Sequence, residues 1–306
     1  MMDAPKLIAI TGGTGFLGRS VVRCLLEQND HSVRALTRRP QTLGGVEWIG
    51  GDLTDHSALE ALCAGADTVI HIAGLTKARK LQHLLDVNEH GAASVAKAAQ
   101  AGGVKRFILI SSIAAREPHL SHYAFSKRAG ETALQNIAKD MELLIIRPPA
   151  IIGAGDDAIR PMLDVLKRGY LPAPSGRAGR TGKMSFVHVD DVARFIVQTV
   201  NTKPDKSIVT PHGATPATGW QDLADAASAA LGQPVKVIPI PPFLLKIAAF
   251  FSQTANSMLF RSGFFNSGKV RELLHIDWTG DTEIGGSLSL EETFQLTFQP
   301  NSTKHS

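Results

Sequence analysis

Short apolar runs recur through the first half of the chain and alternate with segments of helical periodicity. The runs lack polar alternation, which is typical of strands covered on both faces. They lie at 6–10, 32–37, 46–53, 67–74, 105–111 and 142–148. The helical segments lie near 16–29, 55–64, 83–101 and 121–140. This alternation predicts an α/β fold, a doubly wound parallel sheet with helices on both faces.

The regular alternation ends near residue 150. Gly- and Pro-rich stretches at 151–161 and 168–184 predict loops, although a strand-then-helix pattern returns around 183–200. We therefore expect residues 1–150 to form a dinucleotide-binding sheet domain, to which the strand and helix around 183–200 are added. Residues 151–306 are expected to form mainly a smaller, irregular C-terminal lobe that binds substrate.

One apolar segment in the later half has several possible roles. PPFLLKIAAFF at 241–251 is interrupted by Lys246, and no stretch of the chain reaches the ~18 uncharged apolar residues of a membrane span. We expect no integral membrane segment. Residues 241–265 are compatible with core, a lid over a ligand, a face of a homodimer, or a helix at a membrane surface, and these alternatives stay open.

Composition narrows the class of protein. The chain has 306 residues and a net charge of +4, with Lys and Arg scattered, so we expect no nucleic-acid partner. Cys24 and Cys63 lie in helical patterns and suggest neither a disulfide framework nor a zinc site, so no metal is expected. The N-terminus lacks the pattern of a signal peptide. These features favour a reducing, cytoplasmic location.

The stretch LIAITGGTGFLGRS carries the most specific motif. An apolar strand runs directly into Gly12, Gly15 and Gly18, and then into a helix. The first glycine allows the tight turn, the second lets the backbone approach a pyrophosphate, and the third lets the helix pack on the strand. Backbone N–H groups at the helix start, including those of Phe16 and Leu17, then face the phosphates. The motif predicts dinucleotide binding.

The end of the second strand bears on which dinucleotide is bound. In NAD-binding domains an acidic residue about 20 positions after the glycines accepts the ribose hydroxyls. Here the sequence reads Thr37, Arg38, Arg39, without a carboxylate. Because arginine suits a phosphate through charge and bidentate hydrogen bonds, we expect NADP, with NAD possible.

Two further strand ends contribute candidate cofactor contacts. Asp52 and Leu53 end the third strand, where the carboxylate could meet the adenine amino group. Ala73 and Gly74 end the fourth strand, and their small size leaves room for a cofactor in the crevice of an open sheet.

Candidate catalytic residues follow the fifth strand. Ser111 and Ser112 end it, and Tyr123 and Lys127 lie four residues apart on the next helix. A free tyrosine has a pKa of about 10, and a nearby cation stabilises its phenolate. A serine hydroxyl can hold a substrate oxygen while the tyrosine gives or takes a proton.

Seven motifs stand in the order found in one enzyme family: TGGTGFLG (11–18), GDL (51–53), HIAG (71–74), SS (111–112), YAFSK (123–127), RPPAIIGAGD (147–156) and FVHVDDVA (186–193). With them the chain resembles the extended short-chain dehydrogenases/reductases, of the NAD-dependent epimerase/dehydratase type, over about residues 6–200. The resemblance implies a Rossmann fold. It makes Ser112 the substrate-orienting serine, Tyr123 the acid/base and Lys127 its partner.

The resemblance also implies roles for Asn88, on a helix face behind the active site, and for Pro148 and Pro149, in the loop over the nicotinamide. Two departures stand out. Only ten residues separate Ser112 from Tyr123, where sugar epimerases and hydroxysteroid dehydrogenases have a longer loop. The serines are followed by IAAREPH rather than the aromatic-plus-glycine ending common in sugar-nucleotide enzymes.

Together these features predict an NADP-dependent oxidoreductase that interconverts a ketone and a secondary alcohol on a small, fairly apolar substrate. A nucleotide-sugar epimerase or dehydratase is one alternative, in which Arg177, Arg180 and Lys183 could hold a diphosphate. A second alternative is a non-catalytic NAD(P)-binding subunit or assembly factor of a larger complex, and the apolar segment at 241–265 is the feature compatible with it.

Overall fold

The computed structural model describes residues 5–156, 159–202, 204–258 and 266–299, without the side chains of 252–258. The chain forms two compact units. Unit 1 contains the residues up to 118, with 122–147 and 193–209. Unit 2 contains 119–121, 148–192 and the chain from 210 onward. The predicted assignment of substrate binding to the later lobe stays a prediction.

Unit 1 is built on a parallel sheet of seven strands in the order β11-β6-β5-β4-β1-β2-β3. The strands are β1 (Lys6–Thr11), β2 (His31–Thr37), β3 (Val46–Gly50), β4 (Thr68–His71), β5 (Arg106–Ile110), β6 (Glu142–Ile146) and β11 (Ile208–Val209). The order reverses beside β1, as in a doubly wound Rossmann sheet. The predicted fold class is confirmed.

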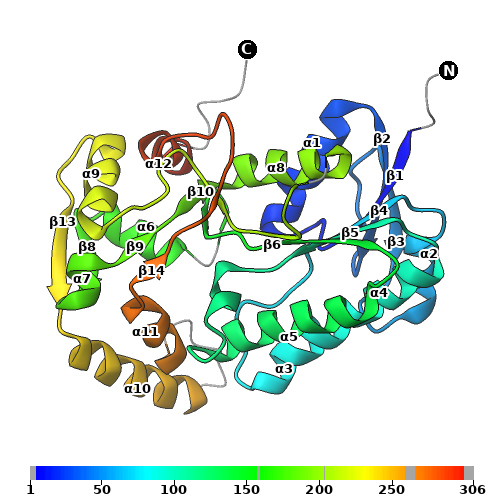
Figure 1. Cartoon of the computed structure of the whole chain (residues 1–306). Helices are drawn as coiled ribbons and strands as arrows, with labels where there is room; N and C mark the ends of the chain where they lie inside the picture. Colours follow the sequence, from blue (N-terminus) through cyan, green and yellow to red (C-terminus); the bar gives the residue numbers. More distant parts are fainter. Residues whose placement is uncertain (1–4, 157–158, 203, 259–265, 300–306) are drawn as a thin grey trace. The chain divides into compact units, whose positions relative to one another are not determined.

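Helices cover both faces of this sheet. They are α1 (Phe16–Gln28), α2 (His56–Cys63), α3 (Leu81–Leu85), the π-helix η1 (Asp86–Gly91), α4 (Ala92–Ala101), α5 (His122–Ile137) and α8 (Val189–Asn201), which begins in unit 2 and continues into unit 1. Figure 1 shows α1 on one face and α3, α4 and α5 on the other. Local signals fix their ends: Asn29 closes α1 in a left-handed conformation, and Asp55 caps α2 through Ala58 N–H.

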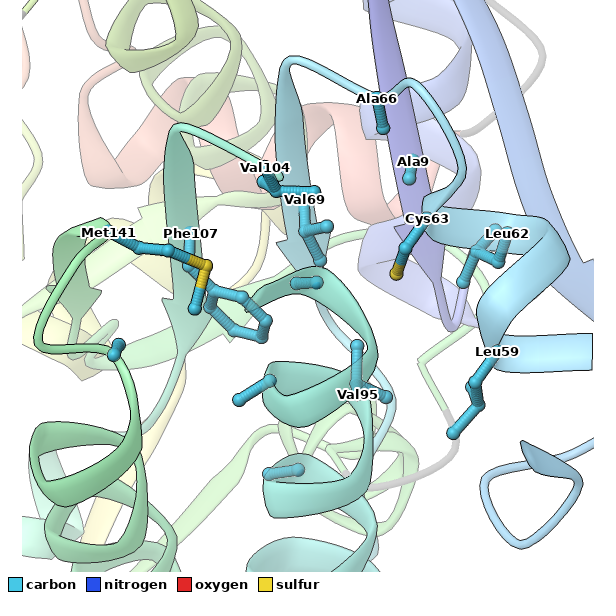
Figure 2. Close-up of a cluster of buried hydrophobic side chains, with 14 of the residues drawn as sticks. Ala9, Leu59, Leu62, Cys63, Ala66, Val69, Val95, Val104, Phe107 and Met141 are labelled. Carbon is cyan, nitrogen blue, oxygen red and sulfur yellow. The ribbon is translucent and has the colours of Figure 1, made fainter. Parts of the chain in front are cut away.

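The core between the sheet and α2, α4 and α5 consists mainly of buried aliphatic side chains (Figure 2). Phe107 of β5 is its largest completely buried side chain, and Leu59 of α2 and Val95 of α4 belong to the same cluster. Burial also raises the pKa of the Cys63 thiol to about 11, so this cysteine acts as a small apolar side chain.

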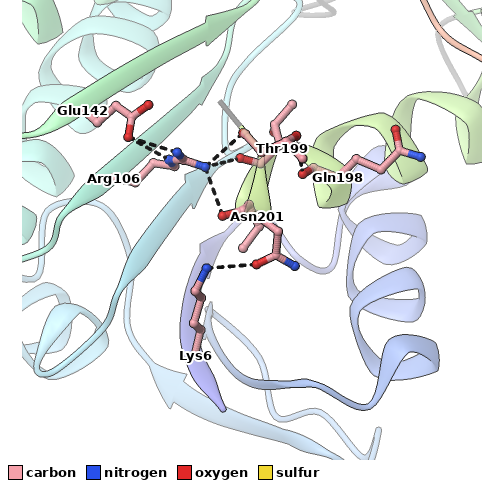
Figure 3. A network of polar contacts seen from close by, with 8 residues as sticks. Lys6, Arg106, Glu142, Gln198, Thr199 and Asn201 are labelled. Atoms are coloured by element: carbon pink, nitrogen blue, oxygen red, sulfur yellow. Dashed lines mark hydrogen bonds and ion pairs between the residues drawn. The ribbon is translucent and has the colours of Figure 1, made fainter. Parts of the chain in front are cut away.

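A polar network ties the amino end of the sheet to the end of α8 (Figure 3). Arg106, the first residue of β5, forms an ion pair with Glu142 at 2.9 Å. The same guanidinium donates to the carbonyl oxygens of Thr199, Val200 and Thr202. The carbonyls of Thr199 and Val200 belong to the last turn of α8, where backbone acceptors lack partners within the helix, and that of Thr202 lies just beyond it. Arg106 therefore satisfies a helix end.

Unit 2 contains short parallel strand pairs: β7 (Ala150–Ile152) with β10 (Phe186–His188), β8 (Tyr170–Pro174) with β13 (Lys236–Ile240), β9 (Lys183–Met184) with β14 (Asp277–Trp278), and β12 (Pro211–His212) with β15 (Thr282–Glu283). Its helices are α6 (Arg160–Leu166), α7 (Arg177–Thr181), α9 (Trp220–Leu231), α10 (Pro242–Met258), α11 (Ser267–Leu274) and α12 (Leu290–Phe298). A core around Leu223 and Phe294 joins α9 and α12. In the described residues, no helix is both long and apolar enough to cross a bilayer.

The long helix expected over 83–101 is interrupted in the structure. It consists of α3, the wider turn of η1, and α4. The reason is visible at Asn88, whose side chain is held by two neighbouring segments, and at Gly130 of α5, where an added Cβ would lie 2.1 Å from the Asn88 carbonyl oxygen. Tertiary contacts thus set the irregular turn, which apolar periodicity does not reveal.

Candidate active site

The turn after β1 brings two strand ends together. Gly12 has a φ of +76°, a conformation that favours glycine. A Cβ at Gly12 would lie 2.5 Å from the backbone nitrogen of Ala73, which lies just beyond β4. Thr11 supports this contact, because its Oγ1 accepts from Ala73 N–H at 3.4 Å. The predicted tight turn at Gly12 is present and is pressed against the next strand of the sheet.

The start of α1 has the form of a phosphate cradle. A Cβ at Gly18 would lie 2.0 Å from the Gly12 carbonyl oxygen, so the helix packs closely on the turn. Gly15 is the exposed N-cap residue, and it has no side chain that could accept a hydrogen bond from the helix start. The N–H groups at Phe16 and Leu17 stand in this first turn, where an anion is stabilised by unpaired donors and the helix dipole. These residues fit the pyrophosphate of a dinucleotide.

The ends of β2 and β3 carry opposite charges. Arg38 and Arg39 are exposed, and the Arg39 carbonyl oxygen accepts from the Thr37 hydroxyl at 2.6 Å. Hydrogen bonds from Thr54 lower the pKa of Asp52, and Arg38 contributes a smaller lowering through its charge. A guanidinium and a carboxylate therefore stand near each other at the edge expected to hold the adenosine end of the cofactor. Leu53 packs against Gly91 of η1 beside them.

Asn88 acts as a clamp behind the end of β4. Its Oδ1 accepts from Leu75 N–H and its Nδ2 donates to the Leu75 carbonyl oxygen, both at 2.8 Å. The same amide donates to Ser126 Oγ at 2.9 Å, and that hydroxyl donates to the carbonyl oxygen of Tyr123. One buried side chain thus fixes the segment at Gly74 and the first turn of α5.

Lys127 lies one turn after Tyr123, as the spacing predicts. Its ammonium donates to the Ile110 carbonyl oxygen at 2.8 Å, two residues before Ser112. The Cβ position of Gly74 is 3.7 Å from Nζ, so Lys127 reaches the ends of β4 and β5 together. Burial lowers the pKa of Lys127 to about 8, and Glu131 opposes the shift.

The two serines after β5 have different surroundings. The buried Ser111 hydroxyl donates to Glu131 Oε1 at 2.5 Å. Glu131 also accepts two hydrogen bonds from Arg147, at 2.8 and 2.6 Å. Ser112 is only half-buried, and its Oγ accepts from Ala114 N–H at 3.2 Å, which leaves its own proton available to donate. Ser111 is therefore held within the protein, whereas the Ser112 hydroxyl is able to donate to a ligand.

The short segment between Ser112 and Tyr123 is ordered by local contacts. Residues Ile113–Arg116 form a 3₁₀ turn that Ser112 caps. Arg128 of α5 donates to the Ala115 carbonyl oxygen at 2.7 Å and secures this turn against the helix. Tyr123 itself is half-buried at the start of α5. Pro148, predicted to contact the nicotinamide, belongs to unit 2, and its role stays a prediction.

Several polar residues of this site escaped the sequence interpretation. Thr11 Oγ1 and His71 Nδ1 lie 2.7 Å apart, and burial, with help from Lys127, lowers the pKa of the histidine to about 3, so His71 is neutral. Ser126, Glu131 and Arg147 complete the layer beneath Lys127. A local signal existed for one of them, since Glu131 follows Lys127 by four residues on the same helix.

Comparison with known proteins places the chain in a family. A family model described as the NAD dependent epimerase/dehydratase family matches residues 8–209. A ceramide reductase of Caulobacter vibrioides is 40% identical over 90% of this chain and 87% of its own length. A UDP-glucose 4-epimerase of Vibrio cholerae is 29% identical over 79% of this chain and 81% of its own length.

Solved structures agree at the level of the fold. The structure of a UDP-glucuronic acid 4-epimerase from Bacillus cereus in complex with NAD superimposes with a TM-score of 0.69. It covers 96% of this chain and 95% of its own, at 16% sequence identity. Taken with the glycine turn on a parallel sheet, these matches show that the chain belongs to the NAD-dependent epimerase/dehydratase family and is an NAD(P)-dependent enzyme of the short-chain dehydrogenase/reductase type.

Proposed function

We propose that the protein is a reductase that converts a ketone into a secondary alcohol on a lipid-like substrate of the ceramide class. The observation that carries this proposal is the 40% identity to a ceramide reductase along 90% of the chain. A ceramide contains a secondary alcohol next to the carbon that bears its amide. The corresponding ketone is the form of such a lipid that a hydride can reduce.

The proposed roles follow from the site geometry. The half-buried Ser112 hydroxyl donates to the carbonyl oxygen of the substrate and orients it. The nicotinamide supplies the hydride when it is bound. Tyr123 gives its phenolic proton to the oxygen as the carbonyl carbon is reduced, so the product is a neutral alcohol. The Lys127 ammonium stabilises the phenolate that remains.

The layer beneath these residues supports the proposed roles. Asn88 holds the backbone at Tyr123 through Ser126, and Glu131 lies one turn beyond Lys127. Because the pKa of Lys127 is lowered only to about 8, its side chain still carries a proton at neutral pH. The cation that the mechanism needs is therefore present under ordinary conditions.

Turnover tests this mechanism directly. Purified protein is incubated with reduced cofactor and the keto form of a ceramide in detergent micelles, and loss of nicotinamide absorbance is followed. We expect turnover by wild type and a loss of about 10²–10⁴-fold in kcat for Tyr123→Phe. Phe125→Leu is the matched control, since Phe125 is exposed on the same helix. Equal rates for wild type and Tyr123→Phe would refute the assignment.

We further propose NADP as the preferred cofactor. Arg38 and Arg39 are exposed beyond β2, where a 2′-phosphate would be recognised, and the residues after this strand include no carboxylate until Glu47. Titration with NADPH and NADH should show tighter NADPH binding, and Arg38→Ala should weaken NADPH binding by about 10-fold or more without changing NADH. Equal affinity of wild type for both would contradict the proposal.

A nucleotide-sugar epimerase is the second candidate, favoured by the family match and the Vibrio relative. It would need cations for a diphosphate. Of the three predicted ones, Lys183 lies 3.4 Å from Asp222 and is already paired. Interconversion of UDP-glucose and UDP-galactose with a cofactor that stays bound through purification would favour the epimerase. Turnover of the keto lipid with freely exchanging NADPH would favour the reductase.

A further inference from the structure

Helix α10 of unit 2 has apolar side chains on two opposite sides. On one side Leu245 and Ala249 are buried against Val270 of the neighbouring helix α11, which lies beside α10 in Figure 1. These contacts form a small core of their own and fix which side of α10 faces the protein. The opposite side is therefore turned outward.

The outward side carries large apolar residues that are 44–65% exposed: Phe243, Leu244, Ile247, Phe250 and Phe251. At about 100° per residue these five positions fall within an arc of about 120°, centred roughly opposite Leu245 and Ala249. They make a continuous apolar stripe along the first three turns of the helix. Isolated exposed apolar residues are common on proteins, but a contiguous stripe marks a contact surface.

The sequence around this stripe is basic, and of its cations Lys269 on α11 is paired with Glu272 at 3.1 Å. Between Asp225 and Glu272 the sequence contains five basic residues and no acidic one, a local charge of +5 in a chain whose net charge is +4. Lys246 lies on α10 itself and Lys236 on β13, and both are exposed. Arg261 lies outside the described residues. A basic segment beside an apolar stripe is complementary to anionic lipid headgroups above acyl chains.

The same charges argue against a second copy of the chain as the partner. A two-fold interface through α10 would bring two such basic segments together, and like charges at an interface oppose association. The length of α10 also fits a helix lying in the plane of a membrane. Its 17 residues span about 25 Å, less than the ~30 Å hydrocarbon core, and its inner side is occupied by α11.

We propose that α10 docks the protein on the surface of a membrane that contains anionic lipids, with the stripe of Phe243, Ile247 and Phe251 inserted at the boundary between headgroups and acyl chains. This inference stands independently of the proposed reaction. It goes beyond that reaction by stating where the enzyme works. Docking would place the protein on the phase from which a ceramide-class substrate must be drawn.

Sedimentation with vesicles tests the docking. The full chain is mixed with vesicles of phosphatidylcholine alone or of phosphatidylcholine with phosphatidylglycerol. We expect wild type to sediment with the mixed vesicles, and Phe243→Ser/Ile247→Ser/Phe251→Ser to bind at least about tenfold more weakly. Lys246→Glu should lose the preference for anionic vesicles, and added salt should weaken binding by wild type. Leu43→Ser/Tyr170→Ser removes exposed apolar residues elsewhere and should bind as wild type.

A second measurement does not depend on the triple variant folding. Ile247→Trp places a fluorophore in the stripe, and its emission should shift to shorter wavelength with mixed vesicles and be quenched by lipids brominated in the acyl chains. Failure of wild type to sediment with either vesicle, or an unchanged Ile247→Trp spectrum, would overturn the proposal. So would a dimer by light scattering that the triple variant converts to a monomer without any vesicle binding by wild type.

Discussion

The two ends of the seven-stranded sheet each hold an arginine–glutamate pair, but the pairs do different work. At the amino end Arg106 and Glu142 link β5 and β6, and the Glu142 side chain is 34% exposed. At the carboxyl end Arg147 and Glu131 link β6 and α5, and the Glu131 side chain is 2% exposed. The first pair sits with three helix-end carbonyls that need a donor, whereas the second lies beside a buried lysine.

The first pair holds the end of a helix, and the second lies beside the candidate catalytic residues. At the amino end the Arg106 guanidinium donates to carbonyl oxygens at the end of α8 that lack partners within the helix. At the carboxyl end Glu131, Arg147 and Lys127 are all buried, and burial lowers the pKa of Lys127. An open α/β sheet binds ligands at its carboxyl end, so this buried charged cluster lies where a cofactor is expected to bind.

The largest expected effect comes from breaking the two ion pairs separately. Glu131→Gln leaves the Arg147 guanidinium buried without a counter-charge and should lower the free energy of unfolding by about 3–5 kcal/mol. Glu142→Gln breaks a partly exposed pair while Arg106 keeps its carbonyl partners, and should cost about 1 kcal/mol or less. Urea unfolding of both variants measures the contrast. Similar losses would show that the two ends are equivalent.

A smaller contrast comes from two glycines with positive φ. Gly12 at the carboxyl end has φ +76° and backbone atoms within 3 Å of an added Cβ, whereas Gly103 at the amino end has φ +72° and open space around it. Gly103→Ala should cost only the left-handed strain, about 1–2 kcal/mol. Gly12→Ala adds a clash with Ala73 and should cost about 2–4 kcal/mol.

Cofactor titration tests the contrast between Gly12 and Gly103 in a second way. Gly12→Ala displaces the start of the phosphate cradle and should weaken NADPH binding, whereas Gly103→Ala should bind NADPH as wild type does. If Gly12→Ala unfolded at the same urea concentration as Gly103→Ala, the close approach to Ala73 would not be a real constraint.

The last expected effect has the opposite sign. Lys127→Met removes a buried ammonium and should raise the free energy of unfolding at pH 7 by about 1–3 kcal/mol while turnover is lost. Since the pKa of Lys127 is about 8 in the folded protein and near 10.5 when exposed, the unfolded wild-type chain holds this proton more tightly. Wild-type stability should rise between those pH values, so the advantage of Lys127→Met should shrink from pH 8 to pH 10.5. A constant difference would exclude a charge effect.

Sequence predicts the sheet well because its signals are local. A continuous apolar run such as RFILI specifies a strand buried on both faces, and the turn from Gly12 to Gly18 specifies a helix directly after its strand. The placement of Tyr123 and Lys127 one helical turn apart could be predicted for the same reason. The interruption at η1 could not be predicted from the sequence, because its irregular turn depends on the contact between Asn88 and Gly130 of a different helix.

The layer beneath the candidate site is non-local and was therefore missed. His71 is the last residue of an apolar strand, and its hydrogen-bonding partner Thr11 lies 60 residues earlier in the chain. Ser111 and Ser112 are identical neighbours in sequence, and only the position of Glu131 on α5 distinguishes them. Residues 119–121 and Pro148 belong to a different unit from the serines, which leaves the substrate side of the site as a prediction.

The chain returns to unit 1 at residues 193–209, and this limits which fragments of the protein can fold by themselves. This segment supplies the edge strand β11 and the end of α8 that Arg106 holds (Figure 3). A fragment ending at residue 150 would expose the edge of β6 as an open template for pairing with other chains. Such a fragment is expected to aggregate. Unit 1 can thus be transplanted or split only if its last 17 residues, 193–209, are restored, covalently or as a complementing peptide.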